Sequence, residues 1–161
     1  MNFREKLVAW EDLPNWRASL KAEGRKLVVT NGCFDLLHLG HITYLETAAN
    51  LGDLLLVGVN GDNAVRQLKG PNRPVIVEAD RAAVLAALQS VGAVCIFEEK
   101  RATRFLEVAQ PDIYVKGGDY TLGTLDKDER NAVEKCGGKI EIISFVPGVS
   151  TTAILQKITA R

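Results

Sequence analysis

The stretch Thr30-Asn31-Gly32-Cys33-Phe34-Asp35-Leu36-Leu37-His38-Leu39-Gly40-His41 decides the fold that we expect for this chain. The apolar run that precedes it, at residues 26–29, is typical of a strand that enters a glycine turn. The segment that follows it, at residues 42–51, has apolar side chains at helical spacing, and Gly52 supplies a stop signal. A strand, a turn and a helix N-terminus direct free backbone N–H groups and the helix dipole toward one point. The stretch therefore predicts an anion-binding site.

The two histidines of the chain, His38 and His41, both lie in this stretch. With His41 opening the helix and His38 just before it, both imidazoles can face one point and donate hydrogen bonds to phosphate oxygens. The alternative is a pair of side chains that only caps the helix or fixes the turn. A zinc site is disfavoured, because structural zinc usually takes four ligands and no cysteine pair or third histidine stands nearby.

Composition favours one globular domain with a full core, because the chain has 161 residues, of which 47% are hydrophobic and 25% are charged. The 20 basic and 20 acidic residues give zero formal net charge, which argues against a nucleic-acid partner but not against a small phosphorylated ligand.

The three cysteines are far apart and form no CxxC motif: Cys33, Cys95 and Cys136. We therefore expect reduced thiols in a cytoplasmic protein. We expect no secretion signal and no membrane segment, because no apolar run reaches the required length.

Strand and helix signals alternate along the chain and predict an α/β fold of the Rossmann-like type, with a five-stranded parallel sheet flanked by helices. We expect strands at residues 26–29, 53–60, 93–97, 112–115 and 139–145. We expect helices at residues 42–51, 62–68, 78–91, 101–109, 126–136 and 153–158.

Residues 1–24 are predicted to be a helical lead-in to the main domain, residues 25–161. Leu7, Val8, Leu13, Trp16 and Leu20 can form one apolar side, and Pro14 suits a helix start after Asp12. We expect this side to pack on the flank of the domain. The alternative is a subunit contact, which makes a homodimer plausible.

Four cations are candidate phosphate ligands. Lys69 and Arg73 lie in a turn-rich loop after the second strand, at the edge where open α/β sheets bind ligands, although a solvated loop is the alternative. Arg81 lies in the first turn of a helix, an unfavourable place for a cation, so it either pairs with Glu78 or binds a ligand phosphate. Lys116 precedes two glycines that let a ligand approach the backbone, unless they form an ordinary turn.

A run of hydroxyl side chains, Ser150, Thr151 and Thr152, precedes the last helix. The alternative is that Ser150 or Thr151 serves only as the N-cap of this helix. Together with the first helix N-terminus, this run would also give a second donor-rich end at the same edge of the sheet, which suits a triphosphate.

The pattern Gly32-x-Phe34-Asp35-x-x-His38-x-Gly40-His41 resembles the signature of the HxGH nucleotidyltransferase superfamily. Its members move a nucleoside monophosphate from a triphosphate onto a phosphate or carboxylate. The further segments at residues 68–74, 81, 115–120 and 148–152 make the chain similar to one branch, the heptose 1-phosphate adenylyltransferases. These occur free-standing or as the second domain of a bifunctional heptose kinase–adenylyltransferase. No kinase domain precedes here, so the chain resembles the free-standing type.

This resemblance implies ATP as donor, heptose 1-phosphate as acceptor, and ADP-heptose and pyrophosphate as products, for lipopolysaccharide or surface-glycan precursors. It implies Mg²⁺ held mainly by phosphate oxygens, with Asp35 either helping to hold the ion or, as we favour, accepting a turn N–H. The alternative is a cytidylyltransferase that uses CTP with glycerol 3-phosphate or ethanolamine phosphate. The arginine that those relatives carry ahead of their hydroxyl run is absent here, where Phe145-Val146-Pro147 stands. A catalytically silent nucleotide-binding module is a further alternative.

The resemblance also assigns roles to residues. The expected catalytic residues are His38, His41 and Lys69. Lys69, Arg73 and Arg81 are expected to bind the substrate phosphate. The expected nucleotide-binding residues are Asn31, Gly32, Cys33, Phe34, Gly40, His41, Lys116, Gly118, Asp119, Ser150, Thr151 and Thr152.

Overall fold

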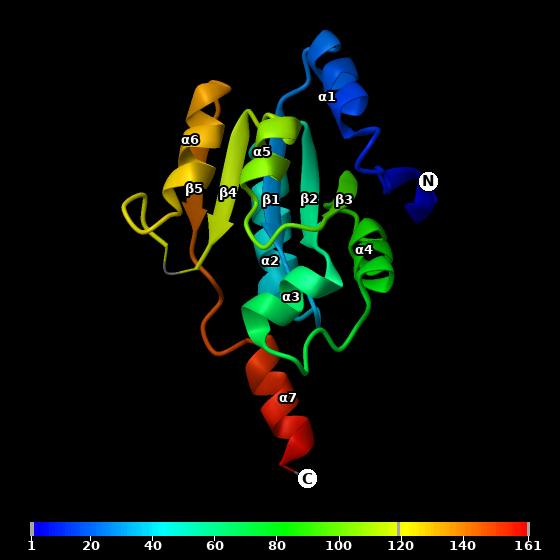
Figure 1. The fold of residues 1–161 in the computed structure, drawn as a ribbon, viewed down its shortest axis with the longest axis vertical. Coiled ribbons are helices and arrows are strands. Elements are labelled where there is room, and N and C mark those ends of the chain that lie inside the picture. Colours follow the sequence, from blue (N-terminus) through cyan, green and yellow to red (C-terminus); the bar gives the residue numbers. More distant parts are fainter. Residues whose placement is uncertain (1, 119, 161) are drawn as a thin grey trace.

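A parallel sheet with the strand order β3-β2-β1-β4-β5 runs through the centre of the molecule (Figure 1). The computed structural model describes residues 2–118 and 120–160. In these residues the strands are β1 (Leu27–Gly32), β2 (Leu54–Asn60), β3 (Ala93–Phe97), β4 (Ile113–Gly117) and β5 (Lys139–Ile143). A short 3₁₀ helix, η1 (Phe3–Lys6), precedes α1 (Leu13–Ala22), α2 (Leu39–Ala49), α3 (Asp62–Lys69), α4 (Glu78–Ala86), α5 (Thr103–Ala109), α6 (Lys127–Lys135) and α7 (Thr151–Thr159). All strand pairs are parallel, so the predicted fold class is confirmed.

The sheet separates two apolar layers, because alternate strand residues point to opposite faces. On one face Leu27, Val29 and Leu56 pack with side chains of α1, α5 and α6. On the other face Val28 and Leu55 pack with side chains of α2 and α4. The continuous apolar runs of β1 and β2 are therefore buried on both sides, as expected for inner strands of a covered parallel sheet.

Strand β1 lies at the point where the chain changes direction across the sheet. From β1 the chain builds outward through β2 to β3, and it then returns to add β4 on the other side of β1. Connections that leave β1 and β4 toward opposite edges leave a crevice at the carboxyl ends of these strands. The Asn31–Gly32 end of β1 and the Lys116–Gly117 end of β4 border that crevice.

The N-terminal segment packs on the flank of the sheet. Leu13 is fully buried and shares the core with the strands, and Pro14 occupies the first turn of α1, as the sequence predicts. The backbone N–H of Val8 donates to Val94 O, which places residues 7–8 beside β3. Among the described residues before Gly24, Leu7 is the large apolar side chain that stays exposed. A homodimer through this segment stays a prediction.

Several predicted boundaries move. Helix α4 ends at Ala86 instead of Val91, and the ammonium of Lys6 donates to Leu88 O and Val91 O beyond its end. Strand β5 ends at Ile143 instead of Phe145, whose side chain is 55% exposed.

Two boundaries next to predicted site residues also move. Helix α2 begins at Leu39, so His38 is its N-cap residue and His41 lies in its first turn. Lys69 is the last residue of α3 and not the first residue of a loop.

The last helix, α7, extends away from the sheet at the end of the molecule where the carboxyl ends of the strands lie (Figure 1). None of its described side chains is buried. Only its first turn approaches the site described below. None of the helices in the described part of the chain is long and apolar enough to cross a bilayer.

Candidate active site

A cleft of about 620 Å³ opens at the carboxyl ends of β1 and β4. This volume is typical of small-molecule sites. The first turns of α2 and α7 both border the cleft, so two helix N-termini present backbone N–H groups to it. Most of the predicted site residues line the cleft: Asn31, Gly32, Cys33, Phe34, Asp35, His38, Gly40, His41, Lys69, Arg73, Lys116, Ser150, Thr151 and Thr152.

The two imidazoles lie together, as their spacing predicts. Their ring centroids are 3.8 Å apart and the ring planes differ by 22°, so the rings stack. The Nδ1 atoms of both rings are buried and have no hydrogen-bond partner among the described residues. Buried polar atoms without partners are costly, and a phosphate ligand would relieve that cost.

Burial controls the protonation of this pair. Loss of water, which is the larger effect, and the neighbouring His38 together lower the pKa of His41 to about 4. Burial also lowers the pKa of His38 below its usual value. Without a ligand both rings are therefore neutral at pH 7, and a bound triphosphate would favour the charged form.

The turn between β1 and α2 is shaped to bring these rings together. Phe34 has φ +47°, a left-handed conformation that costs energy for a residue with a bulky side chain. Its ring is buried and lies 5.3 Å from the His41 ring, measured between centroids. At Gly40, a Cβ atom would lie 3.0 Å from the His38 ring, so any larger residue would press on this ring and disturb the stack.

Asp35 accepts hydrogen bonds from the turn, which is the interpretation that we favoured. Its carboxylate accepts from the backbone N–H groups of Val75 and Ile76 at 2.9 Å and from Arg73 Nε at 2.6 Å. Burial opposes ionisation of this group, but the hydrogen bonds from Ile76, Val75 and Arg73 outweigh it and lower the pKa of Asp35. With these partners, the carboxylate is committed to the protein and does not offer a metal ligand.

The Asp35 contact also fixes Arg73. Because Nε is used in the ion pair, the remaining guanidinium nitrogens of Arg73 are the groups that can face the cleft it lines. Asp35 therefore ties segment 73–76 to the turn that carries the histidines.

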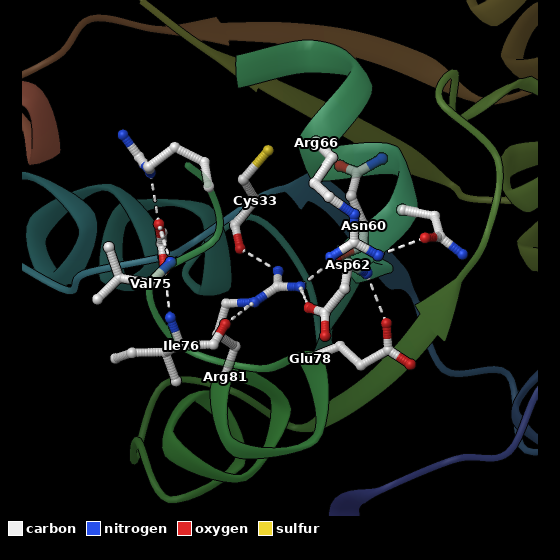
Figure 2. Close-up of polar contacts among 11 residues, drawn as sticks. Cys33, Asn60, Asp62, Arg66, Val75, Ile76, Glu78 and Arg81 are labelled. Atoms are coloured by element: carbon white, nitrogen blue, oxygen red, sulfur yellow. Dashed lines mark hydrogen bonds and ion pairs between the residues drawn. The ribbon is translucent and has the colours of Figure 1, made fainter. Parts of the chain in front are cut away.

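Arg81 does not line the cleft, and its predicted role in binding the substrate phosphate is wrong. Its side chain is fully buried and donates to the backbone oxygens of Cys33, Asn60 and Ile76. Figure 2 shows the guanidinium at the centre of these contacts. The fold turns this side chain inward because three carbonyl groups at the ends of neighbouring segments need a donor there.

The ion-pair alternative for Arg81 is correct in kind, but the partner differs. Arg81 pairs with Asp62 Oδ1 at 2.8 Å, and Glu78 instead accepts the backbone N–H of Asp62 at 2.6 Å (Figure 2). The carboxylate of Asp62 neutralises the buried cation, and Glu78 caps the first turn of α3.

The lysines Lys69 and Lys116 border the same cleft. Lys69 is exposed at the C-terminal end of α3 and is close enough to Cys33 to oppose the effect of burial, which raises the pKa of that thiol. Lys116 is mostly buried at the end of β4, and its ammonium lies 3.5 Å from Glu129 Oε2. Lys69 is thus exposed to solvent, whereas Lys116 is held by an ion pair.

The three hydroxyl side chains before and at the start of α7 have different contacts. Ser150 is the N-cap of α7, because its Oγ accepts the backbone N–H of Ala153 at 3.1 Å. The Thr151 hydroxyl donates to Leu36 O at 3.2 Å, which ties α7 to the segment before the histidines. Thr152 lines the cleft beside them.

A further predicted residue, Gly118, is not placed on the cleft wall. Gly118, at φ +98°, lies beyond the end of β4 and is not part of the wall. A Cβ atom at Gly118 would come within 2.5 Å of the Phe145 ring, so its need for glycine is one of packing as well as of conformation. Asp119 lies outside the described residues.

Sequence reasoning missed part of the wall, namely Asn60, Lys100, Arg101, Asp126 and Glu129. Lys100 and Arg101 follow β3, so their position after a strand's carboxyl end was an available signal. Glu129 lies inside α6, where nothing in the local sequence distinguishes it from a surface carboxylate.

The described residues contain no group of three or more His, Cys, Asp or Glu side chains placed to hold a metal ion. The site therefore offers cations, imidazoles and helix N-termini to an anionic ligand. Such an arrangement can bind several phosphate groups and stabilise negative charge that develops on them.

Comparison with known proteins matches residues 29–157 to the family described as cytidylyltransferase-like. The chain is 50% identical over 145 residues to the bifunctional protein HldE of Trichlorobacter lovleyi, covering 89% of this chain and 29% of that protein. It is 53% identical over 138 residues to the bifunctional protein HldE of Geotalea uraniireducens, covering 86% of this chain and 28% of that protein. The chain thus spans less than a third of the length of these curated relatives.

A solved structure is also similar. It is the lipopolysaccharide core biosynthesis protein of Thermoplasma volcanium, with a TM-score of 0.62 and 30% identity. The likeness covers 76% of this chain and 98% of that one.

Proposed function

This chain belongs to the cytidylyltransferase-like family, and on that premise we propose that it is a nucleotidyltransferase that moves AMP from ATP to a sugar 1-phosphate. The proposed acceptor is heptose 1-phosphate, and the proposed products are ADP-heptose and pyrophosphate. The observation that carries this proposal is the stacked pair His38 and His41 in a cleft bordered by two helix N-termini and lined by Lys69 and Lys116. The identity to bifunctional HldE proteins and the likeness to a lipopolysaccharide core biosynthesis protein support the choice of substrate.

The reaction needs no covalent intermediate with the protein. An oxygen of the sugar phosphate attacks the α-phosphorus of ATP, a new P–O bond forms, and the bond to the bridging oxygen of the β-phosphate breaks. Pyrophosphate then leaves with the electron pair of that bond. Positioning and charge stabilisation are the contributions that such a transfer asks of a protein.

The side chains have separate roles in this proposal. His38 and His41 donate hydrogen bonds to the α-phosphoryl and leaving-group oxygens as negative charge builds on them. Lys69, which is exposed at the C-terminal end of α3, bridges the reacting phosphates. Lys116 and the terminal nitrogens of Arg73 hold the acceptor phosphate or the donor's tail. The first turn of α7 binds the β- and γ-phosphates.

Mg²⁺ is proposed to arrive bound to ATP. The described residues offer it no dedicated group of ligands, and Asp35 is already occupied by three donors. Phosphate oxygens and water are the ligands that Mg²⁺ commonly keeps in such sites. EDTA should therefore abolish turnover but leave the melting temperature of the ligand-free protein unchanged.

We expect this reaction in the cytoplasm, where ATP is available. Cys33, Cys95 and Cys136 are free thiols, in keeping with a reducing compartment.

The decisive experiment incubates the purified protein with each of four nucleoside triphosphates and several phosphorylated acceptors, including heptose 1-phosphate, glycerol 3-phosphate and ethanolamine phosphate. Pyrophosphate release and the product mass are measured. We expect release with ATP and heptose 1-phosphate and a product with the mass of ADP-heptose. A product formed from CTP and glycerol 3-phosphate would instead establish the cytidylyltransferase alternative, and ATP binding without release would establish a silent module.

A further inference from the structure

A buried polar network lies beneath the cleft, and it starts from Glu129 in α6. Glu129 is only 6% exposed. Its Oε1 accepts the backbone N–H of Ala102 at 3.0 Å, and its Oε2 lies 3.5 Å from Lys116 Nζ and 3.3 Å from the Tyr114 hydroxyl. The Tyr114 hydroxyl in turn lies 2.7 Å from Asn31 Oδ1 and 3.2 Å from Lys116 Nζ.

The protons in this network can be assigned by counting. Burial and the nearby Glu129 carboxylate raise the pKa of Tyr114 well above its usual value, so its hydroxyl keeps its single proton. That proton goes to the shorter contact, Asn31 Oδ1. The Glu129 Oε2 atom is then left to the ammonium of Lys116.

This assignment leaves particular donors for a ligand. The oxygen of the Asn31 amide is bound to Tyr114, so its NH₂ group is the part available to the cleft that Asn31 lines. The ammonium of Lys116 uses the Tyr114 hydroxyl and Glu129, and its remaining N–H is available to the cleft. The buried network therefore fixes the orientation of both Asn31 and Lys116 toward the cleft.

A buried carboxylate needs a partner, and its surroundings make Lys116 that partner. Arg101, the cation near the start of α6, is already paired with Asp126. Among the described residues, Lys116 is the cation within ion-pair distance of Glu129. Asp126 also caps α6 by accepting the N–H groups of Asp128 and Glu129, which fixes the backbone from which the Glu129 side chain reaches the network.

We propose that Glu129 is a positioning residue, whose carboxylate holds the Lys116 ammonium and, through the contact of Lys116 with Tyr114, the Asn31 amide in the orientation that meets substrate phosphate. The inference rests on the proposed function for the identity of the substrates. In this proposal Glu129 does not bind a phosphate itself. Its effect on turnover passes through Lys116.

The test is a double-mutant cycle of Glu129→Gln and Lys116→Met. Glutamine keeps an oxygen that can accept the Ala102 N–H, so the fold is expected to survive. Glu129→Gln should lower kcat/KM about 10-fold to 100-fold, the effect of losing a hydrogen bond to a charged group, mainly through KM. In the Lys116→Met background, the same change should alter kcat/KM by less than about twofold.

The matched control is Glu134→Gln, which removes an exposed carboxylate from the same helix, where it pairs with Arg130 four residues earlier. It should leave kcat/KM unchanged. Melting temperatures are measured for all variants. Tyr114→Phe is the second variant, because it removes only the hydroxyl and should reproduce part of the KM effect while keeping the ring in the core.

Three outcomes would overturn the proposal. They are equal effects of Glu129→Gln with and without Lys116, a change in melting temperature alone, and a gain in kcat/KM that marks Glu129 as a competitor for the ammonium. The Kd for ATP and the Kd for inorganic pyrophosphate are also measured by calorimetry for each variant of the double-mutant cycle. Coupling in binding without pyrophosphate release from any acceptor would refute the proposed function and retain the positioning role. Pyrophosphate release combined with additive effects of Glu129→Gln and Lys116→Met would support the proposed function and refute the positioning role.

Discussion

At His41 two opposing effects meet. Burial and the stacked ring of His38 lower its pKa to about 4, whereas a triphosphate in the cleft would raise it again. The folded chain holds this ring neutral until an anion arrives. Ligand binding and protonation are therefore coupled at a single residue.

The first prediction concerns that coupling. Binding of ATP at about pH 5.5 should take up protons, because the ligand-free ring is neutral there and the phosphate-bound ring is charged. Since only two stacked rings share the site, uptake should stay near one proton. Calorimetry in two buffers of different ionisation heat measures it, and His41→Asn is the control. Unchanged uptake in His41→Asn would assign the protons to ATP or to other groups.

The second prediction concerns turnover. His41→Ala should lower kcat by about 10²–10³, the usual cost of losing one donor to a developing oxyanion. Its melting temperature should not fall, because the ring leaves an unpartnered Nδ1 in the ligand-free protein. Thr43→Ala, an exposed change two residues further along α2, is the matched control for steady-state kinetics. A fully active His41→Ala enzyme would refute the assigned role.

At the scale of elements, the carboxyl ends of β1 and β2 and the segment before α4 are joined by one side chain. Arg81 reaches from α4 to the backbone oxygens of Cys33, Asn60 and Ile76, and its charge is balanced by Asp62 of α3 (Figure 2). Asp35 adds the contacts to Val75 and Ile76. The cleft wall therefore depends on buried side chains that do not themselves face the ligand.

The third prediction follows from this joint. Arg81→Met leaves three carbonyl groups without their donor and Asp62 without its cation, so it should destabilise the protein by about 3–5 kcal/mol. Urea unfolding measures the loss. Arg81→Lys should not restore it, because an ammonium cannot span the separate acceptors that the guanidinium reaches.

Arg66→Met is the control for the third prediction, because Arg66 is exposed on α3 and contacts Asn63 of the same helix. Its effect should stay within about 0.5 kcal/mol. A raised KM for Arg81→Met at unchanged stability would contradict the structural role and return Arg81 to the ligand.

At the scale of the whole molecule, the strand order reverses at β1, because β2 and β3 lie on one side of it and β4 and β5 on the other. The N-termini of α2 and α7 both border the cleft at the carboxyl ends of β1 and β4. The N-terminal segment is part of the same body. Leu13 and Leu20 lie in the core layer formed with α5 and α6, and Arg17 pairs with Asp112 at the start of β4.

The fourth prediction tests this integration. Leu13→Ala should destabilise the protein by about 2–5 kcal/mol, the range for a large buried side chain cut to alanine. The kcat/KM of the folded fraction should not change, because α1 lies away from the cleft residues. Leu7→Ala, at a side chain that is 40% exposed, is the control and should cost much less. An equal loss for both would show that α1 adds no specific packing.

Much of the fold could be read from local patterns. Apolar runs, helical spacing and glycine stops depend on neighbours a few residues apart, so they predicted five strands, their parallel arrangement and the helix before each following strand. The same local logic located the turn at residues 30–41 and predicted a cap at Ser150 or Thr151, and the structure shows that Ser150 is the cap. Boundaries moved where distant groups intervened, as after the end of α4, where Lys6 from the N-terminal segment donates to Leu88 O and Val91 O.

The order of strands and helices and the placement of two imidazoles at a helix start could be predicted before folding, because they follow from spacing along the chain. That Arg81 turns inward, that Asp35 holds Arg73 and that Glu129 reaches Lys116 became evident from the folded arrangement alone. A buried charge is defined by its partners, and in these three ion pairs the partners lie 13 to 38 residues apart in sequence. No local period records such a contact, and only folding brings its two sides together.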